Sequence, residues 1–154
     1  MKRFMLLLLA VSVYPYSSGQ ERTKDKESLS LSDLLSGSIV LTDKNLSVES
    51  LQWNPHASFK GVYLKHFVVG ENTNGQISCH IVKIDPYCEL DTHRHSSQIE
   101  IHQVLKGSGT FYLGDKEAEY APGTMSVIPA DTPHKVVAGK DGLYLLAIFT
   151  PTLL

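Results

Sequence analysis

The sequence predicts an all-β fold for most of the chain, either a sandwich or a barrel. From residue 62 onward, apolar and polar residues alternate in runs of four to eight residues, a pattern typical of strands with one buried face. Turn-forming pairs such as Asn74-Gly75 and Pro122-Gly123 separate these runs. Many short strands with hardly any helix between them are characteristic of all-β sandwiches and barrels.

Seven strands are expected in this region. Their ranges are residues 62–69, 77–84, 99–105, 110–113, 124–128, 134–137 and 143–149. The segments 107–109 and 141–142, each containing glycine, are expected to be turns between neighbouring strands. Before this region, the leucine spacing between residues 29 and 41 predicts one short helix, with Ser32 or Asp33 as its N-cap.

Composition and charge restrict the class of protein. The chain has 154 residues, of which 42% are apolar and 19% are charged, as in an ordinary single globular domain. There are 14 Lys and Arg against 16 Asp and Glu, so the charge does not favour nucleic acid as a partner. The two cysteines, Cys79 and Cys88, are too few for a disulfide-built scaffold or a cysteine-rich zinc site. Their spacing along the predicted strands disfavours a disulfide between them.

The first residues have the layout of a secretory signal peptide. Lys2 and Arg3 precede an apolar run from Phe4 to Val13, and small residues follow up to Gly19. This run is too short for a helix that spans a bilayer. We therefore expect cleavage near Gly19 and a secreted or periplasmic protein without a membrane anchor; the alternative is an uncleaved hydrophobic helix. The expected segments are a signal peptide at 1–19, a polar leader and N-terminal segment at 20–60, and the β domain at 61–154.

Four residues are candidate ligands of a metal ion. His93 and His95 lie two positions apart, so both side chains would project to the same face of a strand. Glu100 opens the next strand and can return a carboxylate to that point, while His134 follows a proline and supplies a third imidazole. Three imidazoles and one carboxylate suit one divalent transition metal, namely Fe, Mn, Ni, Cu or Zn.

Two segments of the chain carry a resemblance to a known family. The first reads Tyr87-x5-His93-x-His95-x4-Glu100-x6-Gly107, and the second reads Gly123-x5-Pro129-x-Asp131-x2-His134-x3-Ala138. They resemble the two motifs of the cupin family, G-x5-H-x-H-x(3,4)-E-x6-G and G-x5-P-x-G-x2-H-x3-N, and all four metal-binding positions are present. Tyr87 and Asp131 stand where the family has glycine, and Ala138 replaces its asparagine.

The resemblance implies a small single-domain cupin of RmlC-like type at residues 61–154. The implied fold is a double-stranded β-helix, which is a jelly-roll barrel with the metal inside, preceded by a short irregular or helical segment. The resemblance also implies a homodimer, which exposed sheet edges would favour. The segment 145–151 is similar to that of small cupins that act on unsaturated uronates, whereas the Glu100 ligand does not fit the three-histidine thiol dioxygenases of the superfamily.

Residues beside the predicted metal site are candidates for catalysis or recognition. If Glu100 faces the barrel interior, His102 shares its face by alternation. His102 is then the candidate catalytic acid or base, or it only orients Glu100. Gln98, Tyr112 and Ser126 are candidates for substrate binding, although Tyr112 and Ser126 could simply pack in their strands.

Three function classes remain open for such a chain. An open metal centre can polarise a carbonyl group or stabilise an enolate, so we expect a metal-dependent enzyme for a small oxygenated metabolite, of sugar-acid lyase, isomerase or dioxygenase type. The alternatives are a non-catalytic protein that binds a metal or a carboxylate ligand, and a purely structural barrel, since one fold hosts many functions. His66 and His80 lie on upstream strands whose phase the sequence does not determine.

Overall fold

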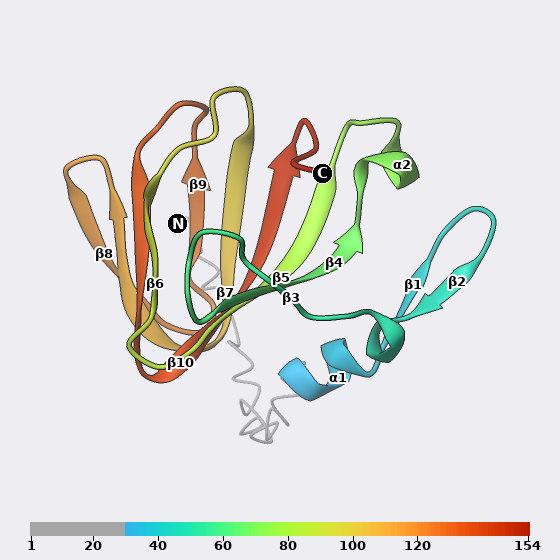
Figure 1. Ribbon diagram of the computed structural model, residues 1–154, viewed down its shortest axis with the longest axis horizontal. Helices are drawn as coiled ribbons and strands as arrows, with labels where there is room; N and C mark the ends of the chain where they lie inside the picture. The colour runs from blue at the N-terminus through green and yellow to red at the C-terminus, as the bar shows by residue number, and fades with distance from the viewer. Residues whose placement is uncertain (1–29) are drawn as a thin grey trace, which may run out of the picture.

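Two layers of antiparallel strands make up most of the protein (Figure 1). The computed structural model describes residues 30–154, so the predicted signal peptide and part of the predicted leader lie outside the described residues. None of the described helices is long and apolar enough to span a membrane. In chain order the elements are α1 (Leu31–Leu35), β1 (Ser38–Val40), β2 (Asn45–Ser47), the 3₁₀ turn η1 (Val48–Ser50), β3 (Asn54–Pro55), β4 (Val62–Val68), α2 (Gly70–Thr73), β5 (Ser78–Ile84), β6 (Glu89–His93), β7 (Ile99–Leu113), β8 (Lys116–Tyr120), β9 (Met125–Ile128) and β10 (His134–Thr150).

Two long strands, β7 and β10, organise the fold. They pair with each other along most of their length, and each runs through both layers. β10 pairs with β6 in its first half and with β5 in its second half, while β7 pairs first with β9 and later with β8. The resulting order is β3-β4-β5-β10-β7-β8, folded so that the two layers face each other (Figure 1). The predicted all-β jelly-roll fold is confirmed.

The predicted strand boundaries are wrong where the long strands bend. The ranges 99–105 and 110–113 join into β7, and the ranges 134–137 and 143–149 join into β10. Gly107 has a φ of +90° and Gly142 a φ of +70°, and the register of β10 on β7 shifts between Ala138 and Leu143. Left-handed residues in paired strands make bulges, so these glycines bend the strands instead of reversing the chain. A Cβ at Gly107 would collide with the carbonyl oxygen of Gly142.

The sequence does not predict β6 and β8, although both belong to the sheet. β8 reads KEAEY, and only its last residue, Tyr120, is buried. β6 reads ELDTH and buries only Leu90. Neither segment has the alternating apolar residues by which a strand is recognised, because each presents mostly polar side chains. Both strands complete the second layer, and β6 ends at His93.

The N-terminal part of the described chain packs on the outer face of the sheet. Helix α1 is capped by Ser30 rather than by Ser32 or Asp33, because Ser30 and Asp33 bond reciprocally in a capping box. After five residues the predicted helix gives way to the β1–β2 hairpin. The buried Lys65 of β4 holds the next segment, since its ammonium group donates to the carbonyl oxygen of Leu51 at 2.8 Å. The chain leading into the barrel is therefore anchored away from the inner face.

The space between the layers changes from apolar to polar toward one end. An apolar row lies in register across four strands: Leu64, Val82, Leu145 and Val104. The next inward-facing row, two residues along each strand, is polar except at its centre: His66, His80, Ala147, His102 and Ser126. A close-packed core would fill both rows with apolar side chains. The second row therefore indicates that this end of the interior serves another purpose.

Three of the described residues other than glycine lie in the left-handed region: Asn74 at the end of α2, and two residues in turns between strands. Tyr87, between β5 and β6, has a φ of +60°, and Asp131, before β10, has a φ of +58°. These are the two positions at which the cupin motifs have glycine, which adopts this conformation without steric cost. Aspartate tolerates it better than tyrosine does, because its short side chain bonds locally. Tyr87, whose side chain is 77% exposed, is therefore the more strained of the two.

Replacing Tyr87 with glycine should stabilise the protein by about 0.5–1 kcal/mol. The left-handed conformation costs an L-residue about 1–2 kcal/mol, and the greater freedom of glycine in the unfolded chain offsets about 0.5–1 kcal/mol of the gain. Urea unfolding followed by circular dichroism measures the change. Asp131→Gly should gain less, since it also removes the ion pair with Arg94. A Tyr87→Gly protein less stable than wild type would contradict this explanation.

Candidate metal centre

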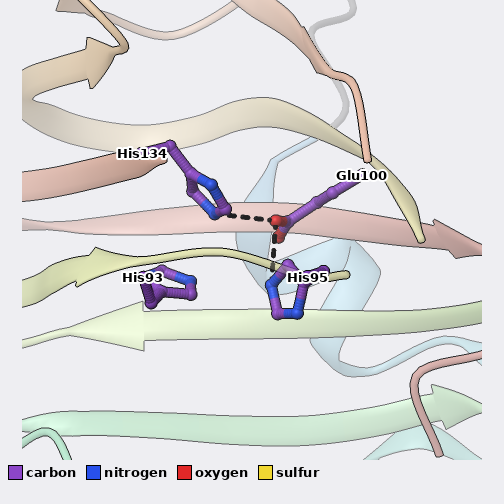
Figure 2. A group of neighbouring side chains, drawn as sticks. All are labelled: His93, His95, Glu100 and His134. Atoms are coloured by element: carbon purple, nitrogen blue, oxygen red, sulfur yellow. Dashed lines mark ion pairs between the residues drawn. The ribbon is translucent and has the colours of Figure 1, made fainter. Parts of the chain in front are cut away.

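The four predicted ligands come together at one end of the barrel (Figure 2). His93 ends β6, His95 lies in the loop that follows, Glu100 is the second residue of β7, and His134 begins β10. One potential ligand atom from each residue lies within 4.8 Å of the others. Strand register causes this convergence, because His134 pairs with His93 and the far end of β10 returns beside Glu100.

Backbone carbonyl groups orient two of the imidazoles. His93 Nδ1 donates to the carbonyl oxygen of Asp91 at 2.7 Å, and His134 Nδ1 donates to that of Thr132 at 2.9 Å. Because a carbonyl oxygen can only accept, each ring carries its proton on Nδ1 and keeps the lone pair of Nε2 for another partner. Hydrogen bonding of this kind at the remote nitrogen is usual for histidines that bind a metal.

The carboxylate of Glu100 fits a cation between itself and the imidazoles. Glu100 Oε2 lies 3.3 Å from His95 Nε2 and 3.1 Å from His134 Nε2. Among the described residues, the buried Glu100 Oε2 and His134 Nε2 have no hydrogen-bond partner. Ligand atoms at about 2.1 Å from one cation and at right angles lie about 3 Å apart, which these separations match. The donor set and its spacing therefore suit one transition-metal ion.

Electrostatics favour the ligating forms of His93 and Glu100 near neutral pH, whereas His134 attracts a proton. Burial lowers the pKa of His93 to about 4, so this imidazole stays neutral. Burial alone would raise the pKa of Glu100, but His102 and the neighbouring imidazoles hold it well below its usual value. Burial lowers the pKa of His134, yet the Glu100 carboxylate and the carbonyl group of Thr132 together raise it above its usual value. A cation entering the cluster would displace the proton that His134 otherwise attracts.

His102 faces inward beside Glu100, as the alternation of β7 predicts. Its Nε2 lies 2.6 Å from Glu100 Oε1, and its Nδ1 lies 3.0 Å from the hydroxyl of Tyr120. Tyr120 in turn donates to the hydroxyl of Ser126 at 2.9 Å. Both ring nitrogens of His102 are therefore engaged with protein groups. This chain of hydrogen bonds holds Glu100 Oε1 and leaves Oε2 for the cluster.

Tyr120 is a residue of this site that the sequence did not identify. It is fully buried and stacks on Phe111, with ring centroids 4.6 Å apart. Burial raises the pKa of its hydroxyl, so the group remains a protonated donor. The rest of β8 is polar and exposed. A single aromatic residue at the end of a charged segment was the only signal that could have revealed it.

Two of the predicted substrate-binding residues have defined partners. Ser126 accepts the hydrogen bond from Tyr120 and lies directly across from His102 in the strand register. Gln98, in the loop before β7, donates from its amide group to the carbonyl oxygen of Thr152 at 3.4 Å. Gln98 thus ties the loop that precedes Glu100 to the segment after β10.

The third predicted substrate-binding residue, Tyr112, is not brought to the site. Its side chain is 36% exposed, whereas the adjacent Phe111 is buried. In β7 the even-numbered residues face inward before the bend at Gly107, and the odd-numbered Phe111 faces inward after it. The sequence alone does not fix which face Tyr112 occupies, because the bend at Gly107 reverses the phase of the alternation. Tyr112 therefore lies on the outer face.

These features define the class of protein: a β jelly roll with a cluster of three histidines and one glutamate in its interior. A family model described as a cupin domain matches residues 80–149. This range runs from β5 into β10 and includes all four candidate ligands. Residues 80–149 of the chain therefore form a cupin domain.

Solved structures with this fold include several cupins. KdgF from Halomonas sp. has a TM-score of 0.59 at 21% identity, over 67% of this chain and 90% of that chain. A predicted oxalate decarboxylase from Thermotoga maritima has a TM-score of 0.62 at 19% identity, over 67% and 95% of the two chains. An RmlC-like cupin from Shewanella frigidimarina has a TM-score of 0.59 at 16% identity, over 68% and 87%. Among curated proteins, no sequence matches this chain.

Removing the Tyr120 hydroxyl should destabilise the protein by about 1–3 kcal/mol, because the buried Nδ1 of His102 would lose its partner. The matched control is Tyr112→Phe, which makes the same chemical change on an exposed ring and should alter stability by less than about 0.5 kcal/mol. Urea unfolding of wild type, Tyr120→Phe and Tyr112→Phe measures both effects. Equal losses in the two variants would show that the hydrogen bonds of Tyr120 add nothing to stability.

Proposed function

We propose that the protein is a metal-dependent enzyme that acts on a small oxygenated metabolite. The observation that carries this proposal is the convergence of three imidazoles and an unpartnered carboxylate oxygen on one point. Four protein donors leave coordination positions free on an ion that takes five or six ligands, as Fe, Mn, Ni or Cu does, whereas they would fill a tetrahedral Zn site. Lyase, isomerase and dioxygenase reactions are the chemistry that such a centre favours.

The protein side chains around this centre have different roles. A divalent cation bound there supplies a Lewis acid that polarises a carbonyl group or stabilises an enolate. Glu100 contributes negative charge and is held through Oε1 by His102. Because both nitrogens of His102 are engaged, we assign His102 to positioning Glu100 and exchanging a proton with it. Direct contact of His102 with a substrate would require one of these bonds to break.

We infer that the substrate is a carboxylate-bearing metabolite, such as a sugar acid or a keto acid. A carboxylate next to a carbonyl or hydroxyl oxygen offers two oxygen donors to the free coordination positions. The similarity of segment 145–151 to cupins that act on uronates supports this class. One protein with the same fold is described as a predicted oxalate decarboxylase, which also points to carboxylates.

A non-catalytic binding protein is the second candidate function. The observation that favours it is the same engagement of His102, because it leaves the cluster without a free base contributed by that residue. In this case the cation and a carboxylate ligand would bind without turnover. The two functions differ in whether metal-dependent product appears.

Enzymatic activity should depend on the native metal and on the four ligands. Elemental analysis of untagged protein identifies the metal, and the metal-loaded protein is then screened with uronates, keto acids and diketones.

His93→Ala/His95→Ala should lose both metal and turnover, because two of the four donors are gone. His102→Gln keeps an N–H donor toward Glu100, so it should retain the metal while turnover falls by about 100-fold.

The outcomes separate the two functions. Metal retained by the double variant at the wild-type level would end the assignment of the ligands. Tight metal and carboxylate binding with no product from any compound would favour the binding protein. A His102→Gln protein with wild-type turnover would remove His102 from the mechanism while leaving the metal centre intact.

We propose in addition that the protein is exported after cleavage near Gly19 and forms a homodimer. The layout of residues 1–19 supports export. Exposed apolar side chains on the outer face of β9, Met125 at 60% and Val127 at 58% exposure, support association with a second copy. Native mass spectrometry of protein from the source culture should give twice the mass of a chain lacking residues 1–19. A monomer, or a chain that retains Met1, would contradict the corresponding part.

A further inference from the structure

A second pair of histidines lies on the inner face of the barrel, outside the metal cluster. His66 of β4 and His80 of β5 are direct neighbours in the strand register, and their Nδ1 atoms lie 3.0 Å apart. His80 is fully buried, and so is Ser78, whose hydroxyl lies 3.1 Å from His80 Nε2. The backbone N–H of Leu153 donates to the same hydroxyl at 3.0 Å. These contacts form one continuous chain from Leu153 to His66.

Counting the protons shows which atom donates in each of these hydrogen bonds. If His80 Nε2 donated to Ser78, the buried hydroxyl would accept twice, and its own proton would have no acceptor among the contacts of the described chain. A buried hydroxyl without an acceptor is costly. Ser78 therefore donates to His80 Nε2, and His80 carries its proton on Nδ1. That proton points at His66 Nδ1, which accepts it, so His66 must carry its own proton on Nε2.

The last group in this series of hydrogen bonds, the Nε2–H of His66, is a donor without a partner among the described residues. His66 is only half-buried, and its Nε2 has no partner among the described residues. Burial lowers the pKa of His66, and it lowers that of His80 to about 4. Both rings are therefore neutral near pH 7. A neutral imidazole whose Nδ1 accepts a hydrogen bond carries its proton on Nε2, so its Nε2 can only donate.

This donor belongs to the polar end of the interior that also holds the metal cluster. His66 and His80 occupy the same row as His102, separated from it by the small Ala147. The ring of Phe149 lies between the two sites, 5.7 Å from His80 and 5.1 Å from His95 between ring centroids. One aromatic ring therefore separates His80 from the cluster, and His66 lies one strand spacing, about 4.8 Å, beyond His80.

We propose that His66 Nε2–H donates a hydrogen bond to an acceptor oxygen of the substrate, with His80 and Ser78 as positioning residues that keep the proton on Nε2. This inference rests on the proposed function, because it assumes a substrate held at the metal centre. It narrows the substrate to an acid that carries a further carbonyl, hydroxyl or carboxylate oxygen away from its chelating end. Sugar acids such as uronates have such oxygens several bonds away from the carboxylate.

The test has one part that needs no substrate. Long-range ¹H–¹⁵N spectra of the metal-loaded protein report the tautomer of each histidine, and His66 should be in the Nε2–H form. Ser78→Ala removes the donor to His80, so His66 should then become a mixture of tautomers. A His66 protonated on Nδ1 in wild type, or a tautomer unaffected by Ser78→Ala, would overturn the inference.

The second part measures binding of D-galacturonate to the metal-loaded protein by calorimetry. His66→Leu should weaken binding about tenfold, the loss expected for one hydrogen bond to a ligand. His66→Gln retains an N–H donor and should stay within about threefold of wild type. Thermal unfolding of both variants reports whether they fold.

The results distinguish this inference from the proposed function. Equal binding of D-galacturonate to wild type and to a folded His66→Leu protein would overturn the role of His66 while leaving the metal-dependent function in place. Weakened binding in His66→Leu that His66→Gln does not restore would also overturn it, because the loss would not be that of a donor. No binding to metal-loaded wild type would overturn the substrate class and the inference together.

Discussion

The buried carboxylate of Glu100 is the interaction on which the interior depends. A buried charge costs several kcal/mol unless positive or hydrogen-bonding groups compensate it. Here His102 meets one oxygen at 2.6 Å, and His95 and His134 meet the other at 3.3 and 3.1 Å. The first oxygen is fully used within the protein, whereas the second faces imidazole lone pairs. A cation is the partner that satisfies that second oxygen and the lone pairs at once.

Long strands, rather than loops, bring most of these groups to the same end of the barrel. Because β10 crosses both layers, its first residue, His134, and its penultimate residue, Phe149, both reach the same end of the barrel. β7 likewise begins beside the cluster with Glu100 and continues to Phe111 in the other layer. Placing ligands on rigid strands limits the freedom that a cation must otherwise remove. Only His95 among the four ligands lies in a loop.

Local patterns predicted the four candidate ligands and the inward orientation of His102, but not the rest of their surroundings. His93, His95, Glu100 and His134 follow from short spacings that motif resemblance captures. Tyr112 lies on the outer face because the bend at Gly107 sets the phase of the residues that follow it. Tyr120 escaped notice because its strand is otherwise charged. The inward orientation of His66 and His80 depends on the pairing of β4, β5 and β10, which no local pattern encodes.

The bends at Gly107 in β7 and Gly142 in β10 limit how many residues can be inserted into these strands. Inward-facing residues of β10 are even-numbered up to Ala138 and odd-numbered from Leu143. One residue added between these points would turn every side chain of one half toward the wrong side, whereas two would restore the facing set. The number of residues between Ala138 and Leu143 is thereby coupled to the orientation of the side chains at the end of the barrel that holds the metal cluster. Natural insertions at this corner should come in pairs or not at all.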